Sequence, residues 1–172
     1  MIIRKLLISN RGEIASRIIR SAHDMGISCV AIYTEADTNT PYVREADQAF
    51  KLSDTYLNAK EILEIAKKND VDAIHPGYGF LSENANFANS VKKAGIKWVG
   101  PSANAIKKMG DKLTAKTLAE KVGVPTLPMG TSSKDAKNIG YPILVKAAAG
   151  GGGKGMRIVD DAKDLKESIA SA

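Results

Sequence analysis

The sequence predicts an α/β protein in which a mainly parallel sheet is covered by helices on both faces. Over the first 100 residues, short apolar runs alternate with segments whose apolar residues recur at helical spacing. These helical segments are about 10–13 residues long, which is enough for the crossovers that parallel strands require. The composition, 44% hydrophobic and 26% charged, is typical of an ordinary soluble globular protein.

Four strands and three helices are expected in this part of the chain. The first helix carries apolar residues on one face and ends at Gly26, where a left-handed residue is favoured. Asn58 and Glu61 form a plausible capping pair for the second helix. Ser82 is expected to cap the third, which ends at Gly95. The predicted strands are residues 5–9, 28–33, 71–75 and 96–99.

The pattern changes beyond residue 100. Residues 102–109 and 111–122 are expected to form two helices, and residues 126–136 a poorly periodic connector. Two short strands, 143–147 and 156–159, should then pair on either side of a glycine-rich loop, followed by a helix that starts near Asp161. Because two strands and a helix do not make a stable domain alone, the sequence is expected to be part of a longer protein.

Composition and charge disfavour several classes of protein. The net charge of +6 would suit an anionic partner, but the 25 basic residues are spread along the chain and only 5% of residues are aromatic, so no nucleic-acid site is expected. No apolar stretch could span a membrane and no signal peptide is evident, which makes the cytoplasm the expected location. The single cysteine, Cys29, lies in a predicted buried strand and has no disulfide partner within the chain.

The glycine-rich segment KAAAGGGGKGM, residues 146–156, does not fit the common phosphate motifs. A P-loop would need glycine at position 148 and a hydroxyl at 155, where the sequence has Ala148 and Gly155. A dinucleotide-binding pattern is also poorly matched in residues 9–13. A flexible hairpin lid is favoured instead, in which the amides of residues 151–153 and the cation of Lys146 approach phosphate oxygens. We expect these glycines to be mobile until a nucleotide binds.

The segment HPGYGFLSEN, residues 75–84, follows a predicted strand at the edge where ligands of open α/β sheets gather. Its glycines predict a tight turn that a ligand could approach closely, with a phenol at Tyr78 and a carboxylate at Glu83. The alternative is a strained connection whose polar groups only cap the next helix. His75 and His23 are the only histidines and there is no thiol pair, so no metal site is expected.

Four motifs together resemble the amino-terminal part of a biotin carboxylase, the ATP-grasp component of biotin-dependent acyl-CoA and pyruvate carboxylases. They are SNRGEIA (residues 9–15), HPGYGFLSEN (75–84), MGDK (109–112) and the glycine-rich segment (146–156), and they span the chain in the family's order. The resemblance implies a Rossmann-like pre-ATP-grasp domain over residues 1–110. A helical connector over 111–140 and an incomplete ATP-grasp lid over 141–172 should follow.

The resemblance also implies an activity and its partners. In this family ATP activates bicarbonate to carboxyphosphate, and N1 of biotin on a carrier protein or domain is carboxylated. A carboxyltransferase subunit or domain then uses the carboxybiotin, and the parent protein is expected to be a homodimer. Which acyl acceptor is used, whether acetyl-CoA, propionyl-CoA or pyruvate, is decided outside this chain.

Five residues match nucleotide-binding positions of the family. Lys112 and Lys146 correspond to lysines that contact ATP phosphates. Gly152 and Gly153 correspond to lid amides over the nucleotide, and Met156 to a residue beside the adenine.

A second group of matches concerns biotin and dimerisation. Tyr78 and Gly79 correspond to the turn that borders the biotin pocket, and Glu83 is a weaker candidate there. Arg17 and Arg20 correspond to positions that some relatives use at a dimer interface.

The family's magnesium-binding glutamates, bicarbonate-binding arginine and catalytic base come later than residue 172. The chain is therefore expected to hold no catalytic or metal-binding residue and to be inactive alone, since phosphoryl transfer without metal carboxylates loses its main charge stabiliser. One alternative is another ATP-grasp ligase, such as a carbamoyl-phosphate synthetase large chain or a purine-pathway carboxylase. The other is a non-catalytic dimerising module.

Overall fold

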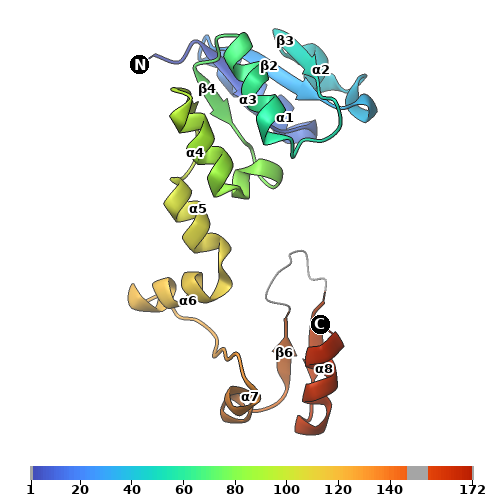
Figure 1. Ribbon diagram of the computed structural model, residues 1–172, viewed down its shortest axis with the longest axis vertical. Coiled ribbons are helices and arrows are strands. Elements are labelled where there is room, and N and C mark those ends of the chain that lie inside the picture. Colours follow the sequence, from blue (N-terminus) through green and yellow to red (C-terminus); the bar gives the residue numbers. More distant parts are fainter. Residues whose placement is uncertain (1, 147–154, 172) are drawn as a thin grey trace. The chain divides into compact units, whose positions relative to one another are not determined.

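The computed structural model describes residues 2–146 and 155–171, which fall into two compact units, Met1–Asp111 and Lys112–Ala172 (Figure 1). We refer to them as the amino-terminal and carboxy-terminal units and describe each by itself. The expected division at 1–110, 111–140 and 141–172 stays a prediction. Most of the glycine-rich segment, including Gly152 and Gly153, lies outside the described residues, so the expected mobility of its glycines is not tested.

The amino-terminal unit is built on a five-stranded sheet with the order β3-β2-β1-β4-β5, in which every neighbouring pair is parallel. The order reverses between β1 and β4, because β2 and β3 extend to one side of β1 while β4 and β5 extend to the other. The predicted parallel α/β fold is confirmed. The strands are β1 (Lys5–Ile8), β2 (Ser28–Tyr33), β3 (Gln48–Lys51), β4 (Ala73–His75) and β5 (Lys97–Trp98).

Helices cover both faces of this sheet, as the alternation of its side chains requires. Leu6 and Ile8 pack with α1 (Gly12–Asp24) and α2 (Pro41–Glu45) in one core. Leu7, between them in β1, points to the other core, which α3 (Ala59–Lys68), α4 (Ala85–Lys93) and α5 (Ala103–Gly110) complete. The central strands β1, β2 and β4 are thus largely buried on both faces of the sheet.

Helix starts follow the predicted capping chemistry in one case and not in another. The Asn58 side chain accepts a hydrogen bond from the Glu61 N–H at 3.2 Å, as expected. The prediction that Ser82 caps the next helix is wrong, because residues Phe80–Glu83 first form a short 3-10 turn, η2. The helix α4 instead begins after Asn84, whose side chain accepts from the Phe87 N–H at 2.9 Å.

Three elements between residues 34 and 51 were not anticipated. They are the 3-10 turn η1 (Glu35–Asp37), the helix α2 and the edge strand β3. The strand has the sequence QAFK, which holds no β-branched residue, and the helix is only five residues long, so neither produces a periodic signal. Their positions depend on packing against β2 and α1.

The carboxy-terminal unit contains a hairpin with a small core. The predicted pairing is confirmed: β6 (Ile143–Val145) and β7 (Arg157–Val159) are antiparallel, with Val145 opposite Arg157. Ala136, Val159 and Leu165 form the core. The helices are α6 (Lys112–Lys121), α7 (Ser133–Ile139) and α8 (Leu165–Ser171), the last preceded by the 3-10 turn η3 (Ala162–Asp164).

The helix α7 lies where a connector was expected. Its start is a capping box in which Ser132 and Asp135 bond reciprocally to each other's backbone. Within the described ranges, no helix of either unit has the length and apolar character needed to cross a bilayer.

Candidate functional site

Two loops meet at the carboxyl edge of the central strands. Ile8, the last residue of β1, is in register with His75, the last residue of β4, and the Ser9 N–H donates to the His75 carbonyl at 2.9 Å. The loop of residues 9–11, which leads into α1, and the turn of residues 75–84 therefore start side by side. They do so where the strand order reverses, which is the place where open α/β sheets bind ligands.

Asn10 ties these two loops together. Its side chain is buried, and its Nδ2 donates to the carbonyl of Pro76 at 2.7 Å and to that of Tyr78 at 2.8 Å. Its Oδ1 accepts from the Arg11 N–H at 2.9 Å. One amide group thus satisfies backbone groups 66 and 68 residues away and sets the shape of the turn.

The turn depends on glycine at two positions for different reasons. Gly77 has φ +64°, and a Cβ there would lie 2.6 Å from Asn10 Nδ2. Gly79 has φ +61°, but a Cβ there would meet nothing within 4 Å, so the space above it is open. Gly77 therefore permits the contact with Asn10, whereas Gly79 leaves room for a ligand against the backbone.

His75 is a neutral part of this turn. Its Nδ1 accepts a hydrogen bond from the Gly77 N–H at 3.0 Å, which places the ring proton on Nε2. Burial, with the nearby charge of Arg17 as the smaller cause, lowers the pKa of His75. The imidazole therefore stabilises the turn as an uncharged acceptor.

The predicted biotin-pocket residues occupy the outer side of the turn. Tyr78 is 58% exposed, and its hydroxyl donates to the Glu13 carboxylate in the first turn of α1. Glu83 lines a shallow surface pocket of about 520 Å³ with Phe80, Asn84, Ala85, Asn86 and Lys107. Tyr78 and Gly79 are not among the lining residues, so the pocket adjoins Glu83 more directly than the other two.

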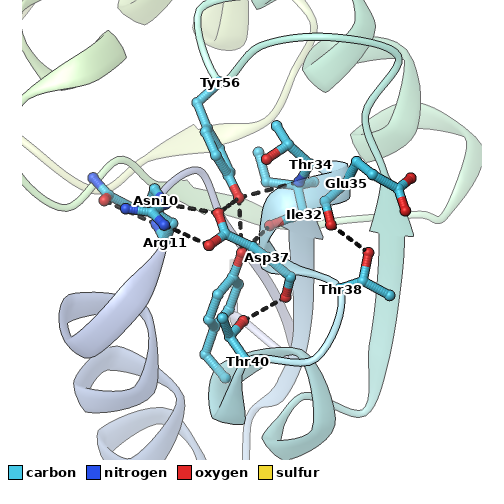
Figure 2. Close-up of polar contacts among 10 residues, drawn as sticks. Asn10, Arg11, Ile32, Thr34, Glu35, Asp37, Thr38, Thr40 and Tyr56 are labelled. Carbon is cyan, nitrogen blue, oxygen red and sulfur yellow. Dashed lines mark hydrogen bonds and ion pairs between the residues drawn. The ribbon is translucent and has the colours of Figure 1, made fainter.

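A polar network around the buried Asp37 holds the loop that follows β1, at Arg11 (Figure 2). Arg11 Nε donates to Asp37 Oδ2 at 2.7 Å, and a second guanidinium nitrogen bonds to Oδ1. The Tyr56 hydroxyl donates to the same carboxylate, accepts from the Thr34 N–H at 3.1 Å and lies 2.9 Å from the Tyr42 hydroxyl. The network therefore links the loop of residues 9–11 to the segments after β2 and β3.

The charges in this network are fixed by their neighbours. Hydrogen bonding from Arg11, with a smaller contribution from Tyr56, holds the pKa of Asp37 below its ordinary value despite burial. The same bond raises the pKa of Arg11. Burial and the bond to Tyr56 raise the pKa of Tyr42. Asp37 is thus a buried anion whose charge is compensated by one cation and one phenol.

Replacing Asn10 by alanine is expected to destabilise the amino-terminal unit by about 2–3 kcal/mol, because two turn carbonyls lose their donor. Unfolding in urea, followed by the fluorescence of the single tryptophan Trp98, measures this loss. Asn104→Ala, at an exposed position of α5, is the control and should change stability by less than about 0.5 kcal/mol. An equal effect of the two substitutions would contradict the assigned role of Asn10.

The predicted nucleotide-binding residues lie in the carboxy-terminal unit. Lys146 and Met156 flank the same end of the hairpin, one position beyond the pair Val145 and Arg157, and both are exposed. Lys112 is the first residue of α6. The two lid glycines are outside the described residues, and among the described positions the register of the hairpin brings Lys146 and Met156 together.

The predicted interface arginines, Arg17 and Arg20, are both exposed on α1. They are three residues apart and therefore share a face of that helix.

Sequence reasoning missed several residues that hold the site. Asn10, Arg11 and Glu13 lie in the motif of residues 9–15, but no role was assigned to them. Asp37 and Tyr56 were not singled out at all. Neither belongs to a periodic segment, and their partners are 26 and 19 residues away, so no local signal could have identified them.

Comparison with known proteins places this geometry in a family. The family description "Biotin carboxylase, N-terminal domain" matches residues 2–106, and "Carbamoyl-phosphate synthase L chain, ATP binding domain" matches residues 104–172. The alpha subunit of mitochondrial methylcrotonoyl-CoA carboxylase from Dictyostelium discoideum is 45% identical over 99% of this chain and 26% of its own length. The mitochondrial pyruvate carboxylase of Rattus norvegicus is 42% identical over 99% of this chain and 16% of its own.

A solved structure of a biotin carboxylase domain is also similar to this chain. The biotin carboxylase domain dimer of Hydrogenobacter thermophilus 2-oxoglutarate carboxylase, in complex with MgADP, ADP and bicarbonate, has a TM-score of 0.92 and 41% identity. The match covers 100% of this chain and 42% of that one. This chain thus spans less than half the length of these relatives. Because the family model covers residues 2–106, which is almost all of the amino-terminal unit, the chain belongs to the biotin carboxylase family.

Proposed function

We propose that this chain is the amino-terminal part of an enzyme that carboxylates biotin at the expense of ATP. Bicarbonate and ATP give carboxyphosphate, which breaks down to carbon dioxide and phosphate, and N1 of biotin is carboxylated. The observation that carries the proposal is the turn of residues 75–84. Asn10 holds it open at the switch point, with Tyr78 exposed and free space above Gly79.

The turn has the chemistry of a site for an uncharged bicyclic ligand such as the biotin ring system. An exposed phenol offers an apolar face and a hydroxyl that Glu13 orients, and Gly79 allows the ring to approach the backbone. Glu83, on the side of the neighbouring pocket, is the weaker contact. These residues bind and orient biotin, while the groups that move protons are proposed to lie beyond residue 172.

The hairpin end has the chemistry of a nucleotide site. Lys146 offers a cation for phosphate oxygens, and Met156, 42% exposed, offers an apolar surface for a base. Lys112, Gly152 and Gly153 complete the proposed set. Magnesium belongs with the phosphates and supplies charge neutralisation there, but its carboxylate ligands are expected in the following part of the protein.

The proposed partners are bicarbonate, a biotin carrier protein or domain, and a carboxyltransferase subunit or domain. Arg17 and Arg20 are proposed to contribute to a homodimer interface, which the dimer of the solved relative supports. A cytoplasmic location is part of the proposal, and the lone cysteine, buried and without a disulfide, is consistent with it. The acyl acceptor stays open, because the relatives above are named for three different ones.

The test is bicarbonate-dependent hydrolysis of ATP by the complete protein, with and without free biotin. We expect biotin to stimulate hydrolysis, and Tyr78→Ala to reduce the stimulated part at least about tenfold while bicarbonate-dependent hydrolysis persists, a loss of about 1.4 kcal/mol. Asn104→Ala is the control. Hydrolysis that biotin does not stimulate would favour another ATP-grasp ligase, such as a carbamoyl-phosphate synthetase large chain or a purine-pathway carboxylase.

The 172-residue chain alone is expected not to turn over. Calorimetry with ATP and sedimentation distinguish its two remaining roles. Binding of ATP supports a nucleotide site that is already formed in this chain, whereas dimerisation without ATP binding supports a dimerising module.

A further inference from the structure

The amino edge of the sheet, opposite the candidate site, carries a cluster of three side chains of different chemistry. His23 lies in the last turn of α1, Cys29 is the second residue of β2, and Asp47 immediately precedes β3. The imidazole nitrogen, the thiol sulfur and a carboxylate oxygen all lie within 4.8 Å of one another. Three segments that are distant in sequence thus converge at one point.

We propose that His23, Cys29 and Asp47 form a binding site for a thiophilic divalent cation of the zinc type. Nitrogen, sulfur and oxygen donors of this kind are the ligands that zinc takes in proteins, at about 2.0–2.3 Å from the metal. Ligand atoms of a tetrahedral site with such bonds are about 3.3–3.8 Å apart. The widest pair in the cluster therefore has to close by roughly 1 Å.

The cluster can make that adjustment because His23 lies at the surface. Its side chain is 41% exposed, so the ring can rotate, whereas the Asp47 carboxylate is held by the Cys29 N–H. Cys29 is buried and fixed by the strand, and its sulfur makes only weak contacts with the carbonyls of Ile19 and Ile27, at 3.9 and 3.8 Å. These weak contacts are lost when the sulfur turns toward a metal, and because burial raises the pKa of the Cys29 thiol to about 11, the metal itself has to displace the thiol proton.

The carboxylate is already oriented for this role. Asp47 Oδ2 accepts from the Cys29 N–H at 2.7 Å and lies 2.9 Å from His23 Nε2, a hydrogen-bonded pair that has to open to about 3.3 Å on coordination. A backbone donor that fixes a carboxylate is the usual support of a metal ligand. On coordination, the thiol gives its proton to solvent, and His23 binds through Nε2 with its proton on Nδ1. The thiolate and the carboxylate then balance the charge of a divalent ion.

One member of the cluster borders a hollow on the surface. His23 lines a pocket of about 220 Å³ with Ser16, Ile19, Arg20 and Glu45, whereas Cys29 and Asp47 do not line it. Solvent reaches the cluster from the side of His23 and Asp47, whose side chains are 41% and 47% exposed, while Cys29 is buried. The sequence alone disfavoured a metal site, because it holds no second thiol and only two histidines. The sequence does not show that one histidine and the cysteine lie next to an aspartate in the folded chain.

The 172-residue chain, without an affinity tag, tests the proposal through titration with CdCl₂ and ZnCl₂. We expect one equivalent of Cd²⁺ to bind and to produce ultraviolet thiolate-to-metal absorption, and Zn²⁺ to compete for the same site. MgCl₂ should give neither signal, because Mg²⁺ prefers oxygen ligands. Cys29→Ser should abolish the absorption, and His23→Gln should weaken binding at least about tenfold.

Glu45→Gln is the matched control, because it removes a neighbouring charge without removing a ligand. It should bind Cd²⁺ as the parent chain does. Far-ultraviolet circular dichroism shows whether each variant is folded, and the thermal midpoint of the unaltered chain should rise with added Zn²⁺. Absence of the absorption in the folded parent chain, or unchanged binding in folded His23→Gln, would overturn the proposal. Biotin-stimulated activity is a separate readout, so neither proposal depends on the other.

Discussion

Replacing Asp37 by alanine is expected to destabilise the amino-terminal unit by about 2–4 kcal/mol. The substitution leaves the Arg11 guanidinium and the Tyr56 hydroxyl without their shared acceptor. Removing one partner of a buried ion pair costs about 3–5 kcal/mol, and the 47% exposure of Arg11 reduces that cost. Urea unfolding followed by Trp98 fluorescence measures the change. Asp54→Ala, at an exposed aspartate, is the control and should be nearly neutral.

The same ion pair predicts how stability depends on pH. Because the pKa of Asp37 is lowered in the folded chain, its stabilising contribution is complete above the ordinary aspartate pKa of about 3.9. The contribution is lost as the pH falls through the lower, folded-state value. Asp37→Asn should therefore be less stable than the parent chain at pH 7, and the difference should shrink below about pH 4. A difference that is constant down to acid pH would contradict this assignment.

Replacing Gly77 by alanine is expected to cost about 2–4 kcal/mol. The left-handed backbone at φ +64° accounts for about 1–2 kcal/mol. The new Cβ would lie 2.6 Å from Asn10 Nδ2 and 3.0 Å from its Cγ, so the amide must move and its bonds to the turn weaken. Urea unfolding again measures the loss.

Two controls separate the causes of the Gly77 effect. Gly95→Ala has a similar φ, +79°, but nothing lies within 4 Å of its Cβ, so only the backbone cost of about 1–2 kcal/mol should appear. In an Asn10→Ala background, Gly77→Ala should also cost less than it does alone, because the clashing amide is absent. Strictly additive losses would show that the contact with Asn10 is unimportant.

The fold could be predicted from sequence where local patterns decide the structure. The apolar runs of β1, β2 and β4 and the capping pair Asn58 and Glu61 each act over a few residues. The strand β3 and the helix α2 could not be predicted, because tertiary packing holds them rather than their own composition. The capping box at Ser132 was visible in the sequence SSKD and could have indicated α7.

The sequence motifs indicated where the candidate site lies, but not which side chains hold its loops in place. Glycine and tyrosine in residues 75–84 marked the turn, and its place after β4 marked the edge. Asn10 shapes this turn through contacts between segments that are distant in the sequence. A pattern read over a few consecutive residues cannot reveal such contacts. The same holds for the carboxylate of Asp37, which is itself buried and meets Arg11 and Tyr56 from distant segments of the chain.

The length of α1 keeps exposed charges at the two edges of the sheet far apart. The helix begins after the loop of residues 9–11 and ends at the cluster of His23, Cys29 and Asp47. Its 13 residues span about 20 Å, more than twice the Debye length of about 8 Å at physiological ionic strength. A cation at one end is therefore screened before its field reaches Tyr78 at the other. Charge introduced at the amino edge should leave ligand binding at the carboxyl edge unchanged.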